Sequence, residues 1–364
     1  MVVRKEVVKV TDRLESGYDV VVIGGGAAGL NGALMLARAR RSVVVIDAGA
    51  PRNAPAEGVH GLLAREGMSP AELLERGRAE VRGYGGHVVS GEVAAVTREG
   101  APSGGAEGEG PEARPGGEFE VALSDGRTVR ARRLLVTAGL VDELPDVPGL
   151  RERWGHEVLH CPYCHGYEVR DQAIGVLSSG PMSVHQALLF RQWSDDVTFF
   201  AHTRARPAGD EAEQLAARGV RVVDGEVASL EVEGDRLVGV RMGDGTVIGR
   251  EALVVAPRME ARAGFLESLG LRAVEHPGGV GTYVPSDATG RTDVPGVWVA
   301  GNVTDLTAQV GAAAAQGAGA GAQINADLVT EETRRAVAAR RALFPAEAEA
   351  RVCQVAMGDR RHGL

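Results

Sequence analysis

The sequence predicts an α/β protein with two related domains, each built on a parallel sheet, the second inserted into the first. Residues 18–37 run as buried strand, glycine turn and helix, residues 173–193 repeat that order, and residues 296–302 add a further strand. Strands that alternate with helices are typical of parallel sheets. We therefore expect a discontinuous first domain at 18–147 and 257–330, an inserted domain at 148–256, and a helical tail at 331–364.

The composition is that of an ordinary globular chain. Its 364 residues, 44% hydrophobic and 24% charged, are enough for two domains with cores of their own. The net charge of −9 argues against nucleic acid or an anionic membrane as the main partner. Residues 1–17 lack the apolar stretch of a signal peptide and no run of eighteen apolar residues occurs, so we expect a cytoplasmic protein. Lysine occurs only at Lys5 and Lys9, which argues against Schiff-base and P-loop chemistry.

The first strand leads into a dinucleotide-binding glycine pattern. Residues 18–23 are an apolar strand run, and Gly24, Gly26 and Gly29 follow before a helical pattern at 30–37. In a Rossmann-like unit the first glycine makes the turn, the second lets a pyrophosphate approach the backbone, and the third lets helix pack on strand. The alternative is a glycine-rich turn that binds no nucleotide. The strand and helix around the glycines favour the nucleotide.

The second strand ends in an acid. Residues 42–47 are apolar up to Asp47, about twenty residues after the glycines, where a carboxylate can accept ribose hydroxyls. Residues 51–74 follow, and a Ser-Pro pair predicts a helix that is capped by Ser69. This segment has no counterpart in the second half. We therefore expect it to contact the ring system of the larger cofactor, with Arg52, Asn53 and His60 as its candidate residues.

The remainder of the first half alternates strands and turns. Strand patterns at 86–96 and 119–129 flank residues 99–118, a Gly/Pro/Glu/Ala segment that we interpret as a disordered hairpin tip without a catalytic role. A further strand from residue 133 reaches a small-residue turn. Its cofactor-facing candidates are Thr137, Ala138 and Gly139.

The second half repeats the first. A strand at 173–178, a turn at Gly180, a helix at 182–193 and a strand at 197–201 succeed one another. Residues 222–230 (VVDGEVASL) echo residues 88–96 (VVSGEVAAV). The chain is therefore expected to hold two copies of one dinucleotide-binding unit.

The C-terminal part returns to the first domain. Residues 296–302 form a strand that ends in Gly301-Asn302, and Gln309 precedes an Ala/Gly-rich helix at 311–327. A helix with small residues on all sides must pack very closely, which suits a helix whose N-terminus abuts a flavin and its pyrophosphate. The lone Cys353 in the tail is expected to be inert.

A redox-active pair lies between the two units, in the segment HCPYCHG at 160–166. A proline after the first thiol predicts a helix start, and thiols at i, i+3 are close enough for a disulfide. The helix N-terminus favours thiolate at Cys161 and Cys164. The imidazoles of His160 and His165 can pass the protons that such cycling releases.

Three other interpretations of this segment compete with a redox-active pair. A zinc site needs four converging ligands, which six consecutive residues cannot supply, so no metal is expected. A structural disulfide does not suit a chain without secretion signals. The tetrapeptide CPYC also occurs in glutaredoxins, but those are small single domains with the motif near the N-terminus, whereas Cys161 lies in the middle of this chain.

These motifs together resemble the low-molecular-weight thioredoxin reductases, FAD-dependent pyridine nucleotide-disulfide oxidoreductases. The resemblance spans about residues 18–328. It implies FAD in the first domain, a redox disulfide in an inserted NAD(P)-type domain, and a homodimer. It also implies that Cys164 faces the flavin and forms a charge-transfer thiolate, while Cys161 exchanges with the substrate.

Two departures bear on the second nucleotide. Residues 178–183 (SSGPMS) replace the second GxGxxA loop, and residues 202–206 (HTRAR) replace the His-Arg-Arg cluster for the NADPH 2′-phosphate, so use of NADPH stays open. His165 also stands where the reductases carry an acid. These features are closest to the dithiol oxidases of the gliotoxin and holomycin type, in which oxygen reoxidises the flavin.

The leading hypothesis is therefore an FAD-dependent oxidase of a small dithiol. An NADPH-dependent reductase of thioredoxin-like proteins is the alternative, and a non-catalytic flavin redox sensor is the alternative of another class.

Overall fold

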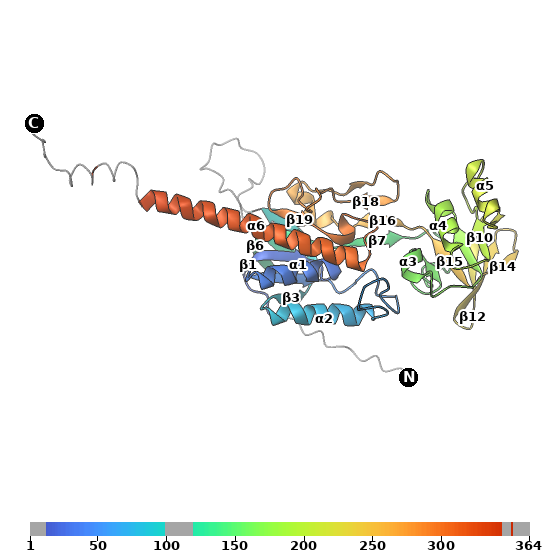
Figure 1. The fold of residues 1–364 in the computed structure, drawn as a ribbon, viewed down its shortest axis with the longest axis horizontal. Coiled ribbons are helices and arrows are strands. Elements are labelled where there is room, and N and C mark those ends of the chain that lie inside the picture. Colours follow the sequence, from blue (N-terminus) through green and yellow to red (C-terminus); the bar gives the residue numbers. More distant parts are fainter. Residues whose placement is uncertain (1–11, 99–118, 344–350, 352–364) are drawn as a thin grey trace, which may run out of the picture.

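The computed structural model describes residues 12–98, 119–343 and Arg351. The expected hairpin tip at 99–118 and Cys353 lie outside the described residues. Two sheets flanked by helices, one wholly parallel and the other mixed with a parallel core, confirm the α/β class (Figure 1). Among the helices of the described residues, none is long and apolar enough to span a membrane.

The first domain is built on a seven-stranded sheet that gathers strands from both ends of the chain. Its order is β3 (His87–Ser90), β2 (Val43–Asp47), β1 (Gly17–Ile23), β6 (Thr128–Val136), β5 (Phe119–Leu123) and β4 (Val93–Arg98), and β19 (Val297–Val299) also pairs with β6. β1 is parallel to both β2 and β6, and β19 is parallel to β6. The apolar runs are long because both faces of this sheet are buried.

Helices α1 (Ala27–Arg38) and α2 (Pro70–Gly83) belong to the same domain. Ser69 caps α2, because its hydroxyl accepts a hydrogen bond from the backbone N–H of Glu72 at 3.3 Å and Pro70 follows it. The Ser-Pro prediction is confirmed.

The C-terminal helix α6 (Val310–Leu343) crosses α1 at very short range. A Cβ on Gly317 would overlap the carbonyl oxygen of Ala28, and one on Gly321 would lie 2.8 Å from the carbonyl oxygen of Gly32. The close packing expected of the small-residue segment is therefore present. The helix differs from the expectation in its extent: residues 331–343 continue the same helix, whereas a separate tail was expected.

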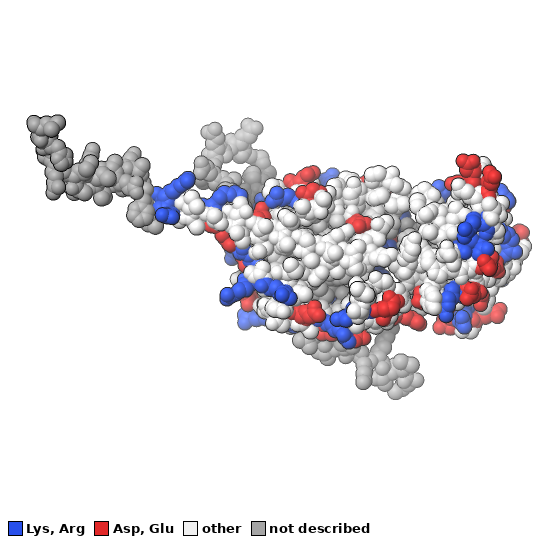
Figure 2. Space-filling view, in the orientation of Figure 1, with Lys and Arg blue, Asp and Glu red and all other residues white. Residues whose placement is uncertain are grey.

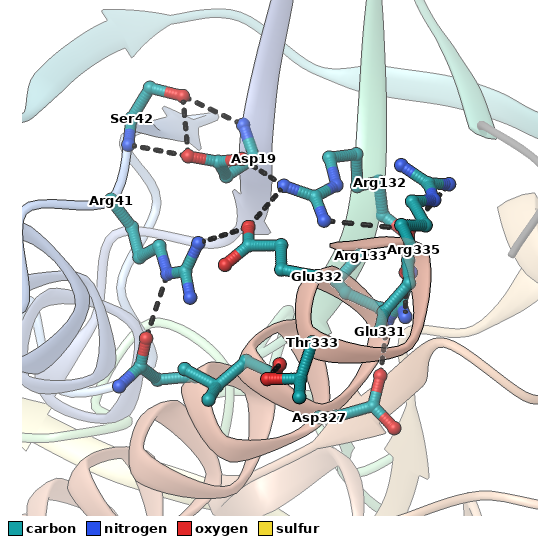
Figure 3. Close-up of polar contacts among 12 residues, drawn as sticks. Asp19, Arg41, Ser42, Arg132, Arg133, Asp327, Glu331, Glu332, Thr333 and Arg335 are labelled. Carbon is teal, nitrogen blue, oxygen red and sulfur yellow. Dashed lines mark hydrogen bonds and ion pairs between the residues drawn. The ribbon is translucent and has the colours of Figure 1, made fainter. Parts of the chain in front are cut away.

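Charged side chains fix the middle of α6 to the sheet (Figure 3). Arg133 is buried and pairs with Asp327 at 2.6 Å and with Glu331. Glu332 joins Arg41 at 2.6 Å to Arg132 at 2.9 Å. Arg132 and Arg133 lie in β6 and Arg41 lies in the loop before β2, so these ion pairs hold one face of α6 against the first domain.

The inserted domain has a five-stranded sheet of its own. Its order is β11 (Arg221–Val223), β10 (Val197–Phe200), β9 (Ile174–Leu177), β15 (Ala252–Val255) and β8 (Val158–Leu159). Its helices are α3 (Pro162–His165), α4 (Ser183–Phe190) and α5 (Asp210–Ala217). Helix α4 is shorter than the expected 182–193.

The internal repeat is imperfect. Strands β4 and β5 join the main sheet of the first domain, whereas their counterparts β12 (Val227–Glu233) and β13 (Arg236–Met242) form a separate three-stranded sheet with β14 (Val247–Gly249).

Two antiparallel strands connect the domains. The chain leaves the first domain through β7 (Leu140–Glu143) and returns through β16 (Arg258–Ala261), which pairs with it. β17 (Val274–Glu275) and β18 (Gly281–Tyr283) complete this four-stranded sheet. The short helix η1 (Gly264–Leu269) lies between β16 and β17, and η2 (Gly301–Val303) follows β19. The inserted domain therefore lies at one end of the molecule (Figure 1).

Candidate functional site

One large cavity, of about 1180 Å³, is lined by both domains. It brings together the residues that the sequence predicted from distant segments: Gly24, Gly26, Asp47, Arg52, Asn53, His60, Thr137, Ala138, Gly139, His160, Cys161, Cys164, His165, Gly301, Asn302 and Gln309. Gly29 is not among the lining residues. It packs against the glycine turn, where a Cβ would overlap the carbonyl oxygen of Gly24.

The first glycine turn is fixed by its neighbouring strand. Gly24 has a φ of 108°, and a Cβ there would lie 3.1 Å from the backbone nitrogen of Ala138. The hydroxyl of Thr137 donates to the carbonyl oxygens of Ile23 at 3.0 Å and Gly24 at 2.8 Å. Thr137, which lines the cavity, therefore also shapes the turn.

The N-terminus of α1 is open towards the cavity. A Cβ on Gly26 would meet no atom within 4 Å, and no side chain caps the helix. The first backbone N–H groups of a helix have no partner within it and attract anions. Asp47, at the end of β2, accepts from Gly49 N–H at 3.1 Å and pairs with Arg78 at 3.0 Å. These groups fit the pyrophosphate and ribose of a flavin dinucleotide.

The segment absent from the second half closes one wall. Arg52 forms a two-point ion pair with Asp142 of β7, with distances of 2.6 and 2.7 Å. His60 contacts Glu66 at 2.6 Å and reaches Glu168 of the inserted domain at 3.6 Å. Arg52 thus ties this segment to β7, and His60 ties it to the inserted domain.

The turn before α6 also lines the cavity, next to Gly61 and Leu62 of that segment. Gly301 has a φ of 74° and its N–H donates to Gln316 at 2.9 Å. The amide of Asn302 donates to the carbonyl oxygens of Asp305 and Ala308, both at 3.0 Å. Asn302 therefore holds the loop that carries Gln309 into the cavity.

The cysteine pair is a disulfide at the start of α3. Cys161 is the N-cap, Pro162 occupies the first turn, and the Cα atoms of Cys161 and Cys164 are 5.3 Å apart. The ring of Tyr163 is 64% exposed and meets Trp193 edge to face. The predicted disulfide is confirmed, on a helix of only four residues.

The two flanking histidines have different surroundings. The His160 ring has its Nδ1 3.3 Å from the carbonyl oxygen of Val255, and burial and the charge of Arg52 hold its pKa below the ordinary value. Burial also lowers the pKa of His165, with Glu168 opposing that shift. Both imidazoles are therefore neutral proton acceptors at pH 7.

The second glycine turn is closed by its own side chains. The hydroxyl of Ser183, 2% exposed, accepts from the N–H groups of Ser179 at 3.2 Å and Gly180 at 3.1 Å. The hydroxyl of Ser179 donates to the carbonyl oxygen of Ala256 at 2.9 Å and accepts from its N–H at 3.0 Å. Donors that would bind phosphate in an open loop are thus paired within the protein.

Three residues near the site escaped the sequence prediction. Asp142 lies in a strand that was not expected, Ser183 begins a helix that was expected one residue earlier, and Gln186 lies inside that helix behind His160. The only signals in the sequence were the acid at Asp142 and a serine three residues after Gly180. Neither has a recognisable spacing.

Charge is mixed on the face shown in Figure 2, where acidic and basic residues alternate over the inserted domain. Within the described residues, no group of three or more His, Cys, Asp or Glu side chains is arranged to hold a metal ion.

The chain is similar to known oxidoreductases over most of its length. The family model for pyridine nucleotide-disulphide oxidoreductases matches residues 18–317. The crystal structure of HlmI is 47% identical, with a TM-score of 0.82, covering 92% of this chain and 100% of that one. An oxidoreductase from Agrobacterium tumefaciens is 35% identical, with a TM-score of 0.76, covering 86% and 99%. The curated thioredoxin reductase sirT of Leptosphaeria maculans is 29% identical over 85% of this chain and 93% of that protein.

The open glycine turn, the disulfide at the start of a helix and the match over residues 18–317 lead to one conclusion: the chain belongs to the pyridine nucleotide-disulphide oxidoreductase family and is a thioredoxin reductase-like flavoprotein enzyme.

Proposed function

We propose that the protein oxidises a small dithiol to a disulfide, with FAD as its cofactor and oxygen as the final acceptor. The observation that carries this proposal is the closed turn at Ser179 and Gly180. A dinucleotide pyrophosphate needs free N–H donors and close backbone approach. Here Ser183 occupies both donors, and Pro181 has no N–H to offer.

The expected 2′-phosphate site gives little support to NADPH. Arg206 is paired with Asp224, and the Nδ1 of His202 accepts the N–H of Val227 at 3.0 Å. Arg204 is exposed and is the remaining cation of the segment. A single exposed arginine is a weak anchor for a dinucleotide whose pyrophosphate turn is closed.

The cysteine pair would act by thiol–disulfide exchange. A substrate thiolate attacks the sulfur of Cys161, the Cys161–Cys164 bond breaks, and Cys164 leaves as a thiolate. The second substrate thiolate attacks the substrate sulfur of the mixed disulfide and displaces Cys161. The substrate leaves as a disulfide, and its two electrons remain on the cysteine pair.

The flavin supplies a two-electron acceptor that oxygen reoxidises, with hydrogen peroxide as the product. In total, one dithiol and one O₂ give one disulfide and one H₂O₂. The two thiol protons must first leave the substrate, because a thiol with a pKa near 8.5 is only a few per cent ionised at pH 7. His160 and His165, both neutral and both lining the cavity, are the candidates that accept them.

The second candidate is an NADPH-dependent thioredoxin-disulfide reductase. The observation that favours it is the similarity to curated relatives that are thioredoxin reductases by name, from Leptosphaeria maculans and Bacillus subtilis. A non-catalytic flavin redox sensor is a third possibility, which absence of turnover with dithiols and with NADPH would favour.

One anaerobic experiment separates the candidates. Purified protein that holds flavin is mixed with dithiothreitol or with millimolar NADPH, and the flavin absorbance is followed. The oxidase should bleach rapidly with the dithiol, regain its colour in air with release of peroxide, and bleach slowly or not at all with NADPH. Rapid stoichiometric bleaching by NADPH, followed by reduction of thioredoxin, would instead establish the reductase.

A further inference from the structure

The segment at 51–74, which has no counterpart in the second half, also contacts the inserted domain. The ring of Pro55 packs against Gly155, where a Cβ would lie 2.5 Å from the Cβ of Pro55 and 3.3 Å from its Cγ. The Nε2 of His60 lies 3.6 Å from a carboxylate oxygen of Glu168. Gly155 precedes the cysteine pair in the sequence and Glu168 follows it. The segment therefore meets the inserted domain on both sides of the disulfide.

Gly155 is joined to the disulfide by a short, hydrogen-bonded stretch of chain. Its φ is 84°, a conformation that glycine adopts readily, and its N–H donates to the carbonyl oxygen of Val158 at 3.0 Å. Val158 begins β8, which ends at Leu159, two residues before Cys161. A displacement of Gly155 would therefore carry β8 and the first cysteine with it.

His60 is held in place from its own domain. The carboxylate of Glu66 lies 2.6 Å from His60 Nδ1 and accepts the N–H of Gly61 at 2.9 Å. The hydrogen bonds with His60 and Gly61 lower the pKa of Glu66, so its carboxylate only accepts and Nδ1 carries a proton. The imidazolium can donate to Glu66 and Glu168 together, whereas the neutral ring can donate to Glu66 alone. His165 is a further titratable group here, since Glu168 and His60 both act on its pKa.

The connection between the domains does not by itself fix their orientation. The chain passes between them through β7 and β16, and relative motion of two domains is the default unless their interface is large and hydrophobic. Transfer of electrons from the cysteine pair needs Cys164 in contact with the flavin. Contacts that hold the inserted domain against the first domain therefore bear directly on the reaction.

We propose that Pro55 and His60 are positioning residues that dock on Gly155 and Glu168 and hold the disulfide helix at the flavin cavity. This inference rests on the proposed transfer of electrons from the cysteine pair to the flavin. Pro55 acts by shape, because any side chain at residue 155 would clash with its ring. His60 acts by charge, because its imidazolium attracts the Glu168 carboxylate across the domain boundary.

Hydrogen–deuterium exchange of the oxidised holoenzyme tests the contact of shape. Gly155→Ala should speed exchange about 10-fold both at 51–68 and at 155–168, because the added methyl group pushes the domains apart. Adding Pro55→Gly should return the rate at 155–168 towards that of the wild type, because the clash is removed. Unchanged exchange at 51–68 in Gly155→Ala, or no recovery in the double variant, would mean that the methyl group strains only its own turn, and would overturn the proposal.

Glu168→Gln tests the contact of charge, since Glu168 is exposed and the substitution keeps its shape. At about pH 5.5, where an ordinary imidazole is mostly protonated, exchange at 51–68 should become about 2- to 5-fold faster. Glu233→Gln removes the same charge from the separate sheet of the inserted domain and should leave this exchange unchanged. Equal rates in Glu168→Gln and the wild type would overturn the role of His60.

A visible spectrum connects docking with the flavin. In Cys161→Ser the charge-transfer band requires Cys164 beside the flavin, so adding Gly155→Ala should weaken the band and adding Pro55→Gly to that variant should restore it. A band of constant strength would overturn the proposal. Neither the exchange nor the spectrum involves turnover. Failure of the wild type to oxidise dithiothreitol would therefore reject the proposed function, whereas the docking contacts are judged by these two measurements.

Discussion

Gly29 lies so close to Gly24 that a Cβ on Gly29 would overlap the Gly24 carbonyl oxygen and stand 2.6 Å from the Thr137 hydroxyl. Gly26, between them in the motif, has open space in the direction of a Cβ. The glycines of one motif are thus required for different reasons. Gly29 permits the close packing of the fold, and Gly26 leaves room for the cofactor.

This contrast predicts different outcomes for two substitutions. Gly26→Val should fold with a melting temperature near that of the wild-type apoprotein but retain no FAD, because the side chain enters the space of the pyrophosphate. Gly29→Ala should lower the melting temperature of the apoprotein itself. Flavin content and calorimetry of both variants provide the check. Retention of FAD by Gly26→Val would contradict the placement.

Local patterns predicted the first domain well. The strand before Gly24, the acid at Asp47 and the Ser69 cap each follow from a few neighbouring residues, and the structure has them in the expected places. The disulfide was equally predictable, because the i, i+3 spacing of Cys161 and Cys164 is set by local helix geometry.

Contacts between distant segments were not predictable. Nothing near Gln186 in the sequence indicates His160, since twenty-six residues separate them and a sheet strand intervenes. The sequence showed that the second turn lacks glycines of the GxGxxA pattern. It could not show that Ser183 closes the turn, because that depends on the direction in which the serine hydroxyl points. The ion pairs that hold α6 just past residue 330, such as Arg133–Glu331, join segments 198 residues apart.

The two cysteines should differ spectroscopically. Cys161→Ser should leave Cys164 as a thiolate beside the flavin and give a long-wavelength absorbance band, whereas Cys164→Ser should not. The measurement is a visible spectrum of each purified variant at pH 7 to 8. The band in the opposite variant would reverse the assignment, and its absence from both would separate the disulfide from the flavin.

The α6 network predicts a pH-dependent stability. Hydrogen bonds from Arg41 and Arg132 lower the pKa of Glu332 from 4.5 to about 2. A carboxyl with a depressed folded-state pKa stabilises the fold fully above its unfolded value of 4.5, and that contribution is lost as pH falls from 4.5 towards 2. The Glu332 side chain is 42% exposed, so solvent screening limits the effect to about 1 kcal/mol or less.

Glu332→Gln should therefore melt about 1–3 °C below the wild type at pH 6. The difference should shrink steadily below pH 4.5. Scanning calorimetry at a series of pH values measures it, and Glu233→Gln, an exposed glutamate at the end of β12, serves as the control. If the difference in melting temperature between Glu332→Gln and the wild type stayed constant down to pH 3, the ion pairs of Glu332 with arginine would not be the source of that difference.

The closed turn at Ser179 and Gly180 should keep NADPH from binding well. In the wild type, loss of two charge-assisted hydrogen bonds at Ser179 and Gly180 should weaken NADPH binding by about two to four orders of magnitude. Ser183→Ala frees both N–H groups, because the hydroxyl that accepts from them is removed. Its flavin should be bleached by NADPH roughly 10- to 100-fold faster than that of the wild type, and still slowly in absolute terms because Pro181 remains.

Ser194→Ala is the matched control: its hydroxyl is equally buried and donates to the carbonyl oxygen of Gln172 at 2.5 Å, away from the turn. Anaerobic stopped-flow absorbance compares the three proteins. Equal rates in Ser183→Ala and Ser194→Ala would mean that the serine does not exclude the dinucleotide.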